Sequence, residues 1–129
     1  MTTALIVQPG QHPQVTQLCD DRDFLNLSVS RDTDFMCSAT ATALENDIAI
    51  IYAQEGVLLC LPGNRRAGNH IIAGTFYIAG VKDGKLRSLS DAEIPKYTLQ
   101  FWEPEIFTEE EIFDSWFDTI FDPLQSPKT

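Results

Sequence analysis

The dipeptide Asp83-Gly84 constrains the fold of this chain more than any other feature of its sequence. It stands between two β-prone runs, residues 74–81 and 85–89. Both of its residues tolerate the positive φ angles that a two-residue hairpin turn requires. We therefore predict that these two runs pair as antiparallel strands.

Other turn and cap signals divide the rest of the chain. We predict strands at 3–8, 14–18 and, more weakly, 34–43, and a second hairpin that pairs 47–53 with 57–61. Helices are predicted at 20–29, from Ser90 to about 102, and at 109–121, the last two opening on the capping-box pairs Ser90/Glu93 and Thr108/Glu111. Pro95 should make the second helix irregular, and Asp122-Pro123 should end the third.

This pattern predicts one α+β domain over residues 1–122, followed by a frayed tail at 123–129. An antiparallel sheet of hairpins would carry two or three packed helices, the last of them acidic and amphipathic. The 129 residues suffice for a core without disulfide bonds.

The net charge of −10 limits the kinds of partner that the surface can bind. A general basic surface for nucleic acid or for anionic lipid is excluded. No apolar run approaches the roughly 18 residues of a membrane helix, and Met1 begins no secretory signal. Three cysteines without CxxC spacing fit a reducing compartment. We therefore expect a cytoplasmic protein.

Acidic residues gather near the C-terminus, where 99–129 hold 8 of the 19 acids and a single base, Lys128. The apolar residues of the predicted helix recur at four-residue spacing and form a stripe: Ile112, Phe113, Trp116, Phe117, Ile120 and Phe121. The ordinary interpretation packs this stripe on the sheet and leaves the acids solvated. Alternatively, Glu109, Glu110, Asp114 and Asp118 imitate a phosphate backbone for a basic partner, or the stripe is exposed and joins a partner or a second copy.

The segment 63–70 is the one concentrated basic site. Its candidate ligand-binding residues are Asn64, Arg65, Arg66, Asn69 and His70. Guanidinium groups match phosphate or carboxylate bidentately, and the flanking glycines allow close approach of a ligand. The segment is compatible with a nucleotide or phosphate pocket, although it lacks the P-loop pattern. The alternative is that Arg65 or Arg66 pairs with the chain's own acids.

Catalysis finds little support in the sequence. His12 and His70 stand in no recognisable spacing with a nucleophile or a metal ligand. An acidic cluster lacks the arrangement of a calcium loop and is interpreted as a solvated face: Asp20, Asp21, Asp23, Asp32 and Asp34. We expect no enzymatic activity, no metal and no cofactor.

The middle of the chain resembles a known family. The resemblance rests on the order of four segments, 52–56, 61–65, 72–80 and 88–94, followed by Tyr97, and the string around Gly74-Thr75-Phe76 is its most specific part. This order resembles the uncharacterised family called domain of unknown function 3846, over roughly residues 3–107. The resemblance implies an accessory gene of phages, plasmids or conjugative elements of Gram-positive bacteria. It implies no catalytic residues.

These observations lead to two hypotheses of function. The first is a non-enzymatic accessory protein of a phage or mobile element that binds a host or element-encoded protein, plausibly inhibiting a basic nucleic-acid-handling defence enzyme through its acidic C-terminal face. The second is a protein that binds or sequesters a nucleotide or phosphate through the Asn64-Arg65-Arg66 segment. Formation of homo-oligomers is possible under either.

Overall fold

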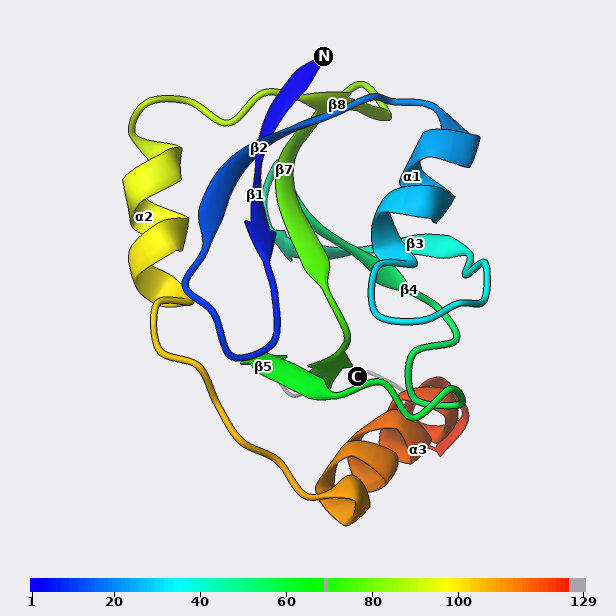
Figure 1. The fold of residues 1–129 in the computed structure, drawn as a ribbon. Coiled ribbons are helices and arrows are strands. Elements are labelled where there is room, and N and C mark those ends of the chain that lie inside the picture. The colour runs from blue at the N-terminus through cyan, green and yellow to red at the C-terminus, as the bar shows by residue number, and fades with distance from the viewer. Residues whose placement is uncertain (69, 126–129) are drawn as a thin grey trace.

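The structure, a computed structural model, describes residues 1–68 and 70–125, with side chains as far as Asp118. Eight strands and three helices follow one another along these residues (Figure 1). The strands are β1 (Thr2–Val7), β2 (Gln14–Leu18), β3 (Ala39–Glu45), β4 (Ile48–Ala53), β5 (Gly63–Ala67), β6 (His70–Ala73), β7 (Phe76–Lys82) and β8 (Lys85–Arg87). The helices are α1 (Arg22–Val29), α2 (Glu93–Gln100) and α3 (Glu109–Gln125). The predicted α+β class, with an antiparallel sheet and packed helices, is confirmed.

The central sheet separates two hydrophobic cores. Its strands lie in the order β2-β1-β7-β4-β3, β8 pairs with the end of β7, and every pairing is antiparallel. Because successive side chains of a strand point to opposite faces, Ala4 and Ile6 enter the core beneath α1, whereas Leu5 and Val7 enter the core beneath α2. Helices α1 and α2 therefore cover opposite faces of the sheet (Figure 1).

The turn at Asp83-Gly84 is as predicted. Asp83 and Gly84 have φ angles of 53° and 76°, and Lys82 pairs with Lys85 across the turn. Strand β8 is shorter than the predicted run, because after Arg87 the chain leaves β7. The backbone N–H of Leu89 then donates to the carbonyl of Thr3 on β1.

The second predicted hairpin is wrong. Residues 47–53 do contain a strand, but β4 pairs with β3 and β7. Residues 54–60 form turns instead of a return strand. Cys60, with φ of 58°, redirects the chain toward β5. Beyond it, β5 and β6 form a separate two-stranded sheet, so the basic segment 63–70, for which no strand was predicted, is a hairpin.

Both predicted capping boxes are present. The Ser90 N–H donates to Glu93 Oε1 at 2.8 Å and the Glu93 N–H to Ser90 Oγ at 3.1 Å; Thr108 and Glu111 make the same pair of bonds. The predicted helix from Ser90 begins later, because residues 91 and 92 form a turn and α2 starts at Glu93; Pro95 then lies in the first turn of α2, where a missing backbone N–H is tolerated.

Helix α3 continues to Gln125, past the predicted end at Asp122-Pro123. Residues 126–129 of the predicted tail lie outside the described residues. Every helix in the described part of the chain falls short of the length and apolar character that crossing a membrane requires.

Glu93 supplies a pH-dependent contribution to stability. Its carboxylate accepts from both terminal nitrogens of Arg87, at 2.8 and 3.0 Å, and from the Ser90 N–H. The Arg87 bond first, and the Ser90 bond second, lower the pKa of Glu93 from 4.5 to about 2. Since the folded-state pKa is depressed, the stabilisation is complete above pH 4.5 and is lost as the pH falls toward 2.

We expect Glu93→Gln to lower the free energy of unfolding by about 1 kcal/mol at neutral pH, a modest value because the ion pair is partly exposed. The difference from the native protein should shrink as the pH falls from about 4.5 to 2, as followed by urea unfolding. Asp34→Asn, at an exposed carboxylate, is the control. A pH-independent difference would contradict the assignment.

Candidate functional site

Helix α3 packs on the small sheet along a narrow face. Ile112 and Ser115 are its buried residues among those described, and Ser115 Oγ accepts from the Ile71 N–H of β6 at 2.9 Å. Gly63 of β5 allows this close approach, because a Cβ there would lie 2.9 Å from Phe107 and 3.0 Å from Ile112. Helix α3 therefore attaches to the β5–β6 hairpin, at one end of the molecule (Figure 1).

Two rows of side chains run along the exposed side of α3. Phe113 and Phe117, one turn apart, form an aromatic row and are 50% and 43% exposed. Glu110, Asp114 and Asp118, also one turn apart, form an acidic row directly beside it, and all three are exposed. Glu109, likewise exposed, continues the aromatic row by one turn toward the helix start. We call the two rows and Glu109 together the α3 surface.

The expectation that the whole apolar stripe packs on the sheet is therefore wrong for half of its described members. Ile112 is buried and Trp116 half-buried, but Phe113 and Phe117 face outward. Ser115 occupies the position that faces β6, which turns the contact face of the helix away from the two phenylalanines. The side chains of Ile120 and Phe121 lie outside the described residues.

A hollow of about 290 Å³ lies beside the aromatic row. Its lining is apolar apart from one carboxylate, and consists of Val57, Cys60, Leu61, Glu109, Ile112 and Phe113. An apolar hollow with one acid at its edge suits a side chain that has an aliphatic stem and a cationic head, which describes lysine and arginine.

The structure places Asn64 and Arg65 inside the protein, with no exposed area. Asn64 Nδ2 donates to the carbonyls of Val7 and Gly74 at 2.8 and 2.9 Å. Arg65 donates from Nε to the Phe101 carbonyl at 3.0 Å, from Nη1 to Asn64 Oδ1 at 2.8 Å, and from Nη2 to the Gln11 carbonyl. Both side chains therefore bind the chain's own backbone.

Burial lowers the pKa of the Arg65 guanidinium, and the negative charges of Glu105 and Glu103 oppose that shift. The alternative that Arg65 pairs with an acid is not what the structure shows, because its hydrogen-bond acceptors are carbonyl and amide oxygens. The charges of Glu105 and Glu103 act on it without a hydrogen bond among the described residues. Arg65 thus joins three distant segments: the β1–β2 connection, β5 and the end of α2.

The other residues of the basic segment lie nearer the surface. Arg66 is exposed, its N–H donates to Glu105 Oε2 at 3.1 Å, and its guanidinium lies 5.5 Å from the centre of the Phe107 ring. His70 is half-buried. Asn69 lies outside the described residues. The predicted anion site would therefore depend on Arg66 and His70, because Asn64 and Arg65 face inward.

Three members of the acidic cluster, Asp20, Asp21 and Asp32, accept hydrogen bonds from backbone N–H groups in different parts of the fold. Asp21 caps α1 through the Phe24 N–H at 3.0 Å, Asp20 accepts from the Leu86 N–H at 3.0 Å, and Asp32 accepts from the Thr75 N–H at 2.6 Å. Among the described residues, no group of three His, Cys, Asp or Glu side chains is placed to hold a metal ion. The interpretation as a uniform solvated face missed these hydrogen bonds.

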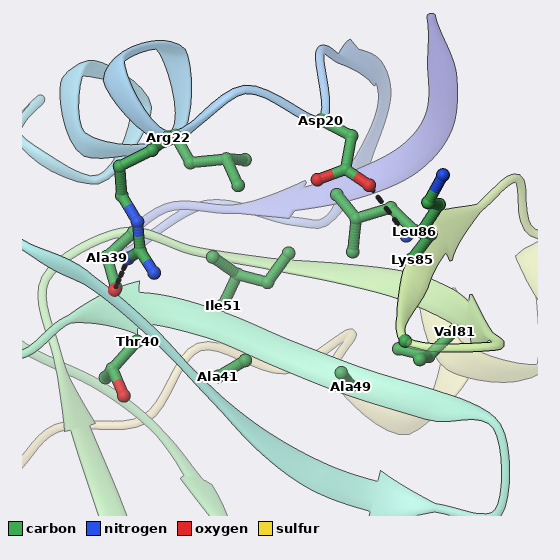
Figure 2. Close-up of a pocket in the computed structure, with 12 residues that line it drawn as sticks. Asp20, Arg22, Ala39, Thr40, Ala41, Ala49, Ile51, Val81, Lys85 and Leu86 are labelled. Carbon is green, nitrogen blue, oxygen red and sulfur yellow. Dashed lines mark hydrogen bonds between the residues drawn. The ribbon is translucent and has the colours of Figure 1, made fainter.

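A second hollow, of about 450 Å³, lies between α1, β3, β4 and the β7–β8 turn (Figure 2). Its floor is made of small and branched apolar side chains, and Arg22 and Lys85 stand on opposite sides of it (Figure 2). Sequence analysis did not predict this hollow, because its lining comes from four segments that only the sheet pairing brings together.

The comparison with known families concerns the part of the molecule that precedes α3. The family model described as Domain of unknown function (DUF3846) matches residues 1–101. The chain belongs to this family. No curated protein and no solved structure matches it. The DUF3846 match ends at Phe101, whose carbonyl Arg65 binds, so it covers both faces of the central sheet and leaves α3 outside.

Proposed function

We propose that this DUF3846 protein is a non-enzymatic binding protein that docks a basic partner protein on the α3 surface. The observation that carries the proposal is the pairing of a half-exposed aromatic row with an exposed acidic row on one helix. Aromatic side chains supply most of the energy in many protein interfaces, and surrounding charges set the partner and the association rate.

The charge of the surface favours a basic partner over a second copy of the chain. In a symmetric dimer each α3 would face another α3, and the carboxylates of Glu109, Glu110, Asp114 and Asp118 would oppose one another. A chain with a net charge of −10 adds a long-range repulsion between copies. Basic groups on a partner would remove both costs.

The hollow beside Phe113 supports the same partner chemistry. A lysine or arginine of the partner can place its stem against Val57, Leu61 and Ile112 and bring its head to Glu109. A protein that handles nucleic acid carries such side chains in its phosphate-binding groove. In the mobile-element setting that the resemblance implies, the partner would be a host defence enzyme of this kind, which the protein would inhibit.

The contacts of His12 support a non-enzymatic role. The His12 ring stacks on Trp102 with centroids 3.8 Å apart, and its Nδ1 lies 2.7 Å from the Trp102 carbonyl. These contacts fasten the segment after α2 to the β1–β2 connection, which makes His12 a structural group.

Site-specific photo-cross-linking tests the proposal. Benzoylphenylalanine in place of Phe117 should give one discrete protein adduct in a lysate of the source organism. The adduct should carry a basic protein and should disappear at about 1 M salt, where charges are screened within about 3 Å. The matched control carries the probe at Val15, which is 56% exposed on β2. Identical adducts from both positions, or an adduct only with a second copy, would overturn the proposal.

A further inference from the structure

The hollow beside α1 has the form of a small-molecule site. Ala41, Ala49 and Ile51 form its floor on β3 and β4 (Figure 2), and Leu25 and Leu86 also line it. Its volume of about 450 Å³ lies within the range of ligand pockets, roughly 300–1,000 Å³. The floor consists of two alanines and one isoleucine, so a planar apolar group can lie on it.

Three charged side chains surround this floor, and two of them, Arg22 and Asp20, make hydrogen bonds to the backbone. Arg22 crosses to β3 and donates one N–H of Nη1 to the Ala39 carbonyl at 2.8 Å, which fixes the guanidinium at the edge of the floor (Figure 2). Lys85 stands on the far side, and Asp20 accepts from the Leu86 N–H at 3.0 Å. The described residues form two ion pairs, Arg87–Glu93 and Lys96–Glu45, and neither involves Arg22 or Lys85.

Arg22 and Lys85 are two cations that line the hollow and form no ion pair among the described residues. We propose that the hollow binds a small planar organic carboxylate, whose ring lies on Ala41, Ala49 and Ile51 and whose carboxylate accepts from the remaining N–H groups of Arg22. Guanidinium and carboxylate match in geometry, and the apolar floor supplies burial.

The surrounding charges select a single negative charge over a double one. Asp20 lines the hollow, and Asp21 and Asp23 flank Arg22 in the sequence. Arg22 and Lys85 bring two positive charges against three negative charges on Asp20, Asp21 and Asp23, a local balance of −1, so a phosphate dianion meets twice the net repulsion that a monoanion meets. This small-molecule proposal therefore concerns the hollow between α1, β3 and β4 instead of the Asn64-Arg65-Arg66 segment, and it is independent of the α3 surface.

The test compares three probes of one shape: naphthoate, naphthamide and naphthyl phosphate, each titrated to about 5 mM against the full chain. Naphthoate should shift the amide resonances of Thr40, Ala41 and Leu86. The neutral amide and the phosphate dianion should bind at least about tenfold more weakly.

Variants of the two cations test which of them binds the carboxylate. Arg22→Gln should weaken naphthoate binding about tenfold or more, and Lys85→Gln a few fold. Lys82→Gln is the matched control, because Lys82 pairs with Lys85 across the turn but does not line the hollow, and it should have no effect. Absence of shifts at these amides, equal binding of naphthamide, tighter binding of the phosphate, or an unaffected Arg22→Gln variant would each overturn the inference.

Discussion

Replacing Arg65 by methionine is expected to lower the free energy of unfolding by about 3 kcal/mol or more. Methionine fills much of the volume but donates nothing. The Phe101 carbonyl, Asn64 Oδ1 and the Gln11 carbonyl would then lose their donor in and near the interior. Urea unfolding monitored by tryptophan fluorescence measures the change.

Arg66→Met is the matched control, since Arg66 is the exposed neighbour and its guanidinium lies over the Phe107 ring. It should cost about 0.5 kcal/mol. Comparing the two variants also distinguishes a structural role of Arg65 from a role in ligand binding. If Arg65→Met keeps native stability, and inorganic phosphate stabilises the native protein but not the variant, Arg65 is a ligand residue and the interior assignment is wrong.

The double substitution Phe113→Ser with Phe117→Ser should weaken partner binding about 100-fold or more, because central aromatic residues commonly contribute 2 kcal/mol or more each. Both side chains are half-exposed, so the free energy of unfolding should change far less than for a core phenylalanine. Calorimetry with the partner captured by cross-linking gives the affinity.

The control for this pair is Leu27→Ser with Leu99→Ser, which removes two exposed apolar side chains from α1 and α2. Its affinity for the partner should equal that of the native protein. A similar loss in the control would mean that general surface hydrophobicity drives the interaction, and an unaffected aromatic-row variant would exclude that row from the interface.

Local signals in the sequence predicted the local structure well. The Asp83-Gly84 turn and both capping boxes involve residues at most a few positions apart, so their chemistry is complete within a short segment. The run 57–61 is not a strand, because Val57 and Leu59 reach the core from consecutive turns and Leu61 from just after them, with Cys60 at positive φ. Nothing local distinguishes such a run from a strand.

Long-range contacts decide the features that the sequence did not predict. An arginine between glycine-rich segments is usually exposed, and the acceptors that bury Arg65 come from residues 54 positions before it and 36 after it. Periodicity placed six apolar residues on one stripe of α3, but the contact of Ser115 with β6 determines which part of that stripe is buried. The hollow at Arg22 likewise depends on sheet pairing.

The central claim, that the α3 surface docks a basic partner, is tested most directly by a salt titration of partner binding after local neutralisation. One variant carries amides at four positions of the α3 surface: Glu109→Gln, Glu110→Gln, Asp114→Asn and Asp118→Asn. A control variant carries the same change in net charge at four exposed positions elsewhere: Asp23→Asn, Asp34→Asn, Asp91→Asn and Glu103→Gln.

Removing like charges that stand one turn apart should leave the stability of the α3 variant within a few tenths of a kcal/mol of native. Its affinity at low salt should fall about tenfold or more, chiefly through the association rate, and its dependence on salt should flatten. The control should keep nearly the native affinity and salt slope. Equal affinities and equal salt slopes for the native protein and the α3 variant, or the same loss in both variants, would contradict the claim.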